Sequence, residues 1–449
     1  MTSLQSTRAL NARKGFSVFS TNKRLTLLLV LLASLAIRFL LAPFSCGSDI
    51  PQFAGFADTF LRHKLCFYEY ADASYWSEED WPYNWIYPYG PLWVFILSAI
   101  RLVVRTPVQC FWTEGTYHVY APIDWVVAVK ILLITGDVAV AFLLYKLVLE
   151  YSGWRRAVLA FSLYLLSPIT IYTSSVYGMF DQLALALALS SMYFYVKRRS
   201  LLACFLGGFS IAFKQTMIFV VLPIILDLLL RGSRRPVVIA LVALVLPFLP
   251  FAVACPHSIS TMISVLRGLS PSYTIPIAYS FNGISSLATY VHGKTGLCMM
   301  PLIKAWFIPF IVLELVSLRY LYRRGNVVCS AMLCYAAFTA TYWRINAQYL
   351  VPLVALAILC LCTREALEKP FCQTLVLASV LLPSFWPIIF PTSWWFKVHI
   401  EHPSQTMIKL VDMFTLKVFD ERLYVCYSLF LTALLYAVVL LCCVTRKKF

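Results

Sequence analysis

A few ionisable side chains interrupt an otherwise apolar chain, and their types suit chemistry on an anionic lipid. Two are the carboxylates Asp49 and Asp181, and two are the cations Lys214 and Arg344. Lysine and arginine stabilise the charge that develops on a departing phosphate, and a carboxylate accepts the proton of an incoming hydroxyl. Direct displacement would invert a sugar carbon, with base and leaving group on opposite faces of the ring. This set therefore favours sugar transfer from a lipid phosphate, provided that the four side chains meet.

The elements that position these residues must be membrane-spanning helices. The chain has 449 residues, of which 61% are hydrophobic and 13% charged, and its mean hydropathy is +0.79. Soluble domains carry about 45–50% apolar and about 25% charged residues, which excludes a soluble enzyme, a secreted disulfide scaffold and a disordered chain. No series of alternating ten-residue strands occurs, so a barrel is not expected. The composition predicts an all-α integral membrane protein.

Basic clusters between the apolar runs predict the orientation of each run. The cluster from Arg8 to Arg24 places the N-terminus in the cytosol. The run 91–104 is short and contains Arg101, and treating it as an interfacial helix places every later basic cluster on the cytosolic side. About twelve spans remain, with both termini cytosolic. They are residues 25–42, 123–149, 157–176, 181–196, 201–213, 216–230, 236–255, 298–320, 327–343, 348–361, 372–394 and 424–444.

The same pattern divides the chain into modules and predicts a break at Lys214 and Gln215. Runs 201–213 and 216–230 are two short spans or one broken span, and half-helices that meet at a polar break usually line a cavity. The predicted parts are a cytosolic basic N-terminus at 1–24, a transmembrane module at 25–255 whose large outer loop at 43–122 holds interfacial helices, an outer loop at 256–297, a variable C-terminal transmembrane module at 298–444 and a cytosolic tail at 445–449.

This topology gathers the candidate site residues at the outer face of the membrane. Local interpretations also exist: Asp49 could cap a helix, Asp181 could neutralise Lys214, Lys214 could snorkel to the interface, and Arg344 could contact lipid headgroups. The candidates are Asp49, Asp58, Tyr177, Asp181, Lys214, Gln215, Arg267, Arg344 and Gln348.

Other partners and cofactors find little support. The net charge of +17 follows from the cytosolic basic clusters, so nucleic acid is not an expected partner. Cys46 and Cys66 flank one loop and could pair, although nothing in the sequence requires it. The segment His399–His402 offers two histidines in a loop, which is weak evidence for a metal. A phosphate-binding glycine loop, a dinucleotide fingerprint and a zinc-protease motif are absent.

Several segments, taken in order, resemble the GT-C glycosyltransferases, membrane enzymes that take sugars from polyprenyl- or dolichyl-phosphate. The likeness covers about residues 25–360 and is divided between the GPI mannosyltransferase I family and the dolichyl-phosphate-glucose glucosyltransferases. The segments that carry it are Gly47–Asp49, Ile86–Trp93, Lys130–Asp137, Ala141–Lys146, Leu166–Pro168, Tyr177–Asp181, Ala212–Gln215 and Asn346–Leu350.

The resemblance implies a GT-C fold with an outer-face site. It implies that Asp49 is the catalytic base and that Lys214 and Arg344 hold the donor phosphate. Arg267, from the outer loop at 256–297, is a further candidate for the donor phosphate. Asp58, Tyr177, Asp181, Gln215 and Gln348 are expected to support them. The loop lacks the second carboxylate of the Asp-x-Asp pattern found in the mannosyltransferases, so we expect no cofactor and do not favour a divalent metal.

The sequence thus predicts an inverting hexosyltransferase, with mannose favoured over glucose and a glycan or glycolipid as acceptor. The alternatives are a transporter or lipid flippase, and a non-catalytic subunit of a glycosylation complex. The expected location is the ER membrane in a eukaryote and the plasma membrane in a prokaryote.

Overall fold

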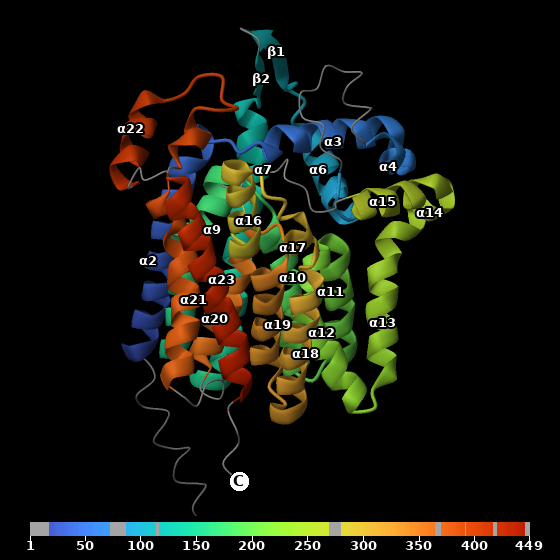
Figure 1. The fold of residues 1–449 in the computed structure, drawn as a ribbon, viewed down its shortest axis with the longest axis vertical. Coiled ribbons are helices and arrows are strands. Elements are labelled where there is room, and N and C mark those ends of the chain that lie inside the picture. The colour runs from blue at the N-terminus through green and yellow to red at the C-terminus, as the bar shows by residue number, and fades with distance from the viewer. Residues whose placement is uncertain are drawn as a thin grey trace, which may run out of the picture.

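The computed structural model describes residues 18–71, 87–113, 116–268, 280–363, 370–390, 392–415 and 420–444. Helices stand side by side in a bundle, and short helices and one β-hairpin gather at its upper end (Figure 1). The described part is mainly helical, and several of its helices are apolar enough to cross a membrane. The prediction of an all-α, multi-pass membrane protein is therefore confirmed.

The bundle helices are α2 (Val18–Leu41), α7 (Ile123–Ser152), α8 (Trp154–Leu165), α10 (Asp181–Val196), α11 (Ser200–Phe213), α12 (Ile218–Leu230), α13 (Arg234–Val245), α18 (Phe307–Arg324), α19 (Val327–Thr341), α20 (Ala347–Cys362), α21 (Pro370–Ile389) and α23 (Glu421–Val444). The shorter elements are η1 (Ala42–Phe44), α3 (Asp49–His63), η2 (Lys64–Cys66), α4 (Phe67–Tyr70), α6 (Pro91–Val103), α9 (Pro168–Ile171), η3 (Tyr172–Tyr177), η4 (Gln215–Met217), η5 (Leu246–Phe248), α14 (Leu249–Ala254), α15 (Pro256–Gly268), α16 (Gly283–Thr295), α17 (Met300–Lys304), η7 (Ser393–Phe396) and α22 (Gln405–Phe414). Strands β1 (Gln109–Thr113) and β2 (Thr116–Tyr120) pair antiparallel.

Six helical stretches of the described chain are long and apolar enough to cross a membrane. A seventh arises if α8 and the bent segment Pro168–Tyr177, which meet at 48°, form one span. The other predicted runs also lie on helices, but these are shorter: α10, α11, α12, α19 and α20. Helices α19 and α20 are buried on nearly every side, as expected of apolar helices at the centre of a bundle. The count of about twelve spans stays a prediction.

The segment from α3 to α6 covers the upper end of the bundle. Helix α3 lies across that end, and the short helix α6 packs against it (Figure 1). Trp93 of α6 is fully buried and stacks on Phe180 with ring centroids 4.4 Å apart. Other parts of the protein therefore cover the Trp93 face of α6, the helix that the sequence predicts to lie at the membrane interface.

A disulfide fixes this upper layer to the α14–α15 corner. It joins Cys66, at the end of η2, to Cys255, and the two Cα atoms lie 5.2 Å apart. Cys46 is a buried free thiol. The pairing of Cys46 with Cys66 that the sequence left open is therefore not formed.

A buried ion pair joins three helices inside the bundle. The guanidinium of Arg38 on α2 lies 3.2 Å from the carboxylate of Asp137 on α7. Arg38 also donates to the carbonyl of Leu165 at 2.7 Å and to the hydroxyl of Thr170 at 3.1 Å. The hydroxyl of Tyr164 donates to Asp137 at 2.9 Å. Since charges inside a membrane protein are costly unless an opposite charge or backbone carbonyls compensate them, this cluster fixes α2 against α7 and α8.

Replacing Arg38 with methionine should destabilise the fold by about 3–5 kcal/mol, because Asp137 is then left buried without its counter-ion. The melting temperature in detergent measures the effect. The double variant Arg38→Met/Asp137→Leu should melt above the single variant, and Arg24→Gln, at an exposed position, should melt like the wild type. An unchanged melting temperature for Arg38→Met would contradict this assignment.

Candidate active site

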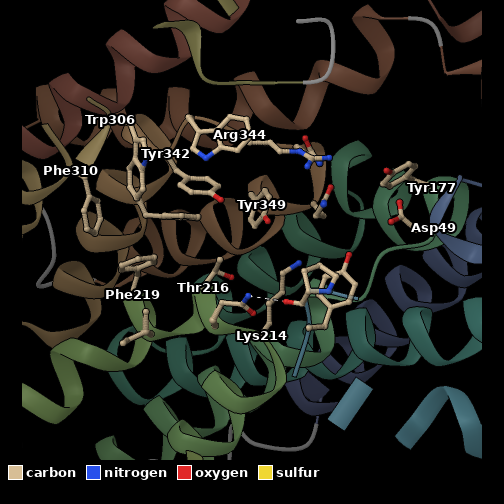
Figure 2. Close-up of a pocket in the computed structure, with 18 of the residues that line it drawn as sticks. Asp49, Tyr177, Lys214, Thr216, Phe219, Trp306, Phe310, Tyr342, Arg344 and Tyr349 are labelled. Atoms are coloured by element: carbon tan, nitrogen blue, oxygen red, sulfur yellow. Dashed lines mark hydrogen bonds between the residues drawn. The ribbon is translucent and has the colours of Figure 1, made fainter. Parts of the chain in front are cut away.

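A cavity of about 650 Å³ lies at the upper end of the bundle. It has a polar end, where Asp49 and Tyr177 lie next to each other, and an aromatic end formed by α12, α18 and the segments around α19 (Figure 2). The polar end contains six of the nine residues that the sequence singled out. These are Asp49, Tyr177, Lys214, Gln215, Arg344 and Gln348.

Asp49 is the first residue of α3, where a carboxylate interacts favourably with the helix dipole. Its side chain is only partly buried and lines the cavity, and it accepts a hydrogen bond from the Tyr177 hydroxyl. Burial raises the pKa of the Asp49 carboxyl, whereas Tyr177, Arg344 and Lys214 act in the opposite direction. The arrangement suits a base: the proton affinity is above that of an ordinary aspartate, and nearby cations still favour the ionised form.

Lys214 lies at the predicted break, in extended backbone between α11 and η4. Its ammonium is 2.6 Å from the carboxylate of Asp181, and both side chains are buried. The same ammonium lies over the rings of Phe180 and Tyr349, 4.9 and 5.0 Å from their centroids. Asp181 thus serves as counter-ion behind the cavity wall, which is the local interpretation that the sequence allowed for it.

The remaining polar groups come from the loop before α20 and from η4. Arg344 is partly buried and faces the cavity from the side opposite Lys214 (Figure 2). Gln348 is buried in the first turn of α20. Gln215 is exposed and donates to the carbonyl of Pro88 at 3.1 Å. Residues from four separate parts of the sequence therefore converge on one space.

Asp58 was expected at the site and does not lie there. It pairs with Arg101 at 2.7 Å on the far side of α3. The reason is helical periodicity: Asp58 follows Asp49 by nine residues, or two and a half turns, so the two carboxylates point in opposite directions. Arg267 belongs to α15, but its side chain lies outside the described residues.

The aromatic end was missed from the sequence, which assigned most tryptophans and tyrosines to interfacial belts and loop packing. Phe219 stacks on Phe338 with centroids 4.7 Å apart and contacts Phe310 at 5.4 Å. Phe338 stacks on Tyr342 at 5.2 Å, and Tyr342 contacts Trp306 at 5.0 Å. These five rings form an apolar wall, here called the aromatic wall.

The described residues contain no group of three or more His, Cys, Asp or Glu side chains arranged to hold a metal ion. The two histidines of the 399–402 segment diverge. His399 is buried, with its Nδ1 2.9 Å from the carbonyl of Val119, and His402 is exposed.

Residues 72–231 match a family model described as the N-terminal domain of alpha-(1->6)-mannopyranosyltransferase. The match covers about a third of the chain and includes Tyr177 and Lys214, but not Asp49 or Arg344. It supports a glycosyltransferase, and among these a mannosyltransferase. The narrower likeness to the GPI mannosyltransferase I and glucosyltransferase families stays a prediction.

We expect cysteines at positions 49 and 344 to react from the same side of the membrane with a small, membrane-impermeant thiol reagent. The test uses Asp49→Cys and Arg344→Cys in sealed vesicles, with the exposed Cys298 and Cys426 replaced by serine. Arg198→Cys is the control, because the exposed Arg198 lies beyond the far end of the 16-residue helix α10. Labelling of positions 49 and 344 from opposite sides would refute a shared site.

Proposed function

We propose that this chain is a GT-C mannosyltransferase that moves mannose from a polyprenyl-phosphate donor to a glycan or glycolipid acceptor at the outer face of the membrane. The observation that carries the proposal is one cavity in which a basic carboxylate, Asp49, faces the cations Lys214 and Arg344, with an aromatic wall beside them. The family match supports mannose as the sugar.

In the proposed reaction Asp49 accepts the proton of the acceptor hydroxyl. The hydroxyl oxygen bonds to the anomeric carbon of mannose while the bond from that carbon to the phosphate oxygen breaks. The electron pair of the broken bond leaves with the lipid phosphate, and the anomeric carbon is inverted. The hydrogen bond from Tyr177 fixes the direction of the Asp49 carboxylate.

The two cations have unequal roles in this scheme. Lys214 is already paired with Asp181 at 2.6 Å, so together they contribute little net charge. Arg344 is therefore the main source of positive charge for the donor phosphate, and its planar guanidinium can bind two phosphate oxygens at once. The mechanism as proposed includes no divalent metal.

The aromatic wall would hold the isoprenoid chain of the donor. It adjoins the cations, since the ring of Tyr349 lies under the Lys214 ammonium and contacts Phe338 at 5.8 Å. An amphipathic donor needs this order, with a charged group at one end of a cavity and an apolar surface next to it. A cavity for a free nucleotide sugar would gain nothing from it.

Asp49→Asn should lower turnover by about 10²–10⁴-fold while leaving donor binding nearly unchanged, because it removes the base but keeps the shape of the side chain. The assay uses purified protein, a panel of polyprenyl-phosphate sugars and candidate acceptors. Asp58→Asn, on the opposite face of α3, is the matched control and should keep activity. Near-normal turnover of Asp49→Asn at normal expression would exclude Asp49 as the base.

Phe219→Ala should raise KM about tenfold for donors with long isoprenoid chains and much less for donors with short ones, because a ring of the aromatic wall is lost. Phe205→Ala is the control, since Phe205 is 39% exposed on the outer side of α11. Equal effects on long and short donors would place the lipid chain elsewhere.

A further inference from the structure

Lys130 is a buried cation that the proposed reaction does not use. It lies on α7 with 0% exposure, and the ion pairs of the described residues do not include it. Its three N–H donors are instead shared among backbone oxygens within hydrogen-bond distance of Nζ: Ala42 at 3.0 Å, Ser175 at 2.8 Å, Val176 at 3.3 Å, and Ser45. The Ser45 hydroxyl, at 2.9 Å, is a further acceptor.

These oxygens belong to two separate segments, and both are helix ends. Ala42 and Ser45 follow the end of α2, and Ser175 and Val176 lie in the last turn of η3, a π-helical segment. Carbonyls at a helix C-terminus lack intrahelical partners and carry the negative end of the helix dipole. One ammonium therefore satisfies orphan acceptors from both helices, which compensates for burying its charge without a carboxylate.

The two segments carry the two residues of the proposed base. Asp49 lies four residues after Ser45 in the sequence, and Tyr177 directly follows Val176. Two more hydrogen bonds connect the segments: the N–H of Gly47 donates to the carbonyl of Tyr177 at 3.1 Å, and the Ser45 hydroxyl donates to the carbonyl of Ser175 at 2.9 Å.

The two segments pack so closely that larger side chains would not fit at their glycines. A Cβ atom at Gly47 would overlap the carbonyl of Tyr177, and one at Gly178 would overlap the side chain of Ile50. Gly178 also has a φ of +91°, a conformation that favours glycine. The junction of residues 45–50 with residues 175–178 is thus closely packed around Lys130.

We propose that Lys130 is a positioning residue whose ammonium locks the segment that carries Asp49 onto the segment that carries Tyr177. This rests on the proposed role of Asp49. Lys130 does not touch the substrate in this scheme and acts through the geometry of the Asp49–Tyr177 hydrogen bond.

Loss of the contacts made by Lys130 should change the pKa of Asp49 in one direction. The Tyr177 hydrogen bond favours the ionised form of Asp49 and lowers its pKa, so weakening that bond lets the pKa rise further above its usual value. The acidic limb of the activity profile then moves to higher pH. The charged and titratable groups that act on Asp49 or feel its charge are Cys46, Tyr89, Tyr177, Asp181, Lys214, Arg344 and Tyr349.

The test compares the wild type with Lys130→Met, which replaces the lysine by an unbranched side chain one atom shorter and removes the ammonium. We expect kcat to fall by about 10²-fold with little change in donor KM, and the acidic limb to move to higher pH. Tyr177→Phe should move the limb in the same direction. Arg38→Met removes another buried cation that does not touch residues 45–50; it should lower stability and leave the limb in place.

A second measurement separates this inference from the proposed function. The protonated Asp49 carboxyl can be titrated by infrared difference spectroscopy against Asp49→Asn, which needs no turnover. A raised Asp49 pKa in Lys130→Met supports the positioning role of Lys130 whether or not a sugar donor is found. Failure to find a donor would count against the proposed function and not against this role. If Lys130→Met does not accumulate, Ser45→Ala should give a smaller shift of the same sign. An unmoved pKa in the variant that folds overturns the inference.

Discussion

The need to compensate the buried cations determines where the parts of this site lie. Inside a membrane bundle an uncompensated charge is costly, so each buried cation is held by acceptors that come from other elements. Arg38 uses Asp137, Lys214 uses Asp181, and Lys130 uses the carbonyls at two helix ends. These contacts connect α2, α7, η3, α10 and α11, the elements that bring the polar end of the cavity together.

The same constraint leaves one carboxylate and one cation facing the cavity without being neutralised by the Lys214–Asp181 pair. Because Lys214 and Asp181 neutralise each other, Asp49 and Arg344 are the pair that faces the open space. If Arg344 binds an anionic ligand, it neutralises Asp49 less, and the carboxylate becomes a stronger base. Binding of a phosphate and activation of a hydroxyl would then be coupled through electrostatics, without a change in the fold.

The sequence predicted which residues meet at the polar end of the cavity, because basic clusters predict on which side of the membrane each inter-helix segment lies. The basic clusters predict the orientation of the helices, and six of the candidates that this prediction placed together line one cavity. The prediction for Asp58 was wrong because the direction in which a side chain of α3 points depends on its position in the helical turn, and not on the side of the membrane on which α3 lies. The aromatic wall and the Cys66–Cys255 disulfide, which joins residues 189 apart, depend on tertiary packing. Local sequence patterns do not predict such contacts.

Asp49 and most of the aromatic wall come from different parts of the chain. The region that matches the mannosyltransferase model supplies Lys214 and Phe219, whereas Trp306, Phe338 and Arg344 come from beyond it. The apolar surface is thus built mainly by α18, α19 and the loop before α20, and the proposed base lies at the start of α3. Such a division lets the surface that would accept a lipid chain change in sequence while the carboxylate, its tyrosine and the buried lysine beneath them keep their geometry. In the proposed mechanism, selectivity for the lipid and chemistry on the sugar would then be separable properties of one cavity.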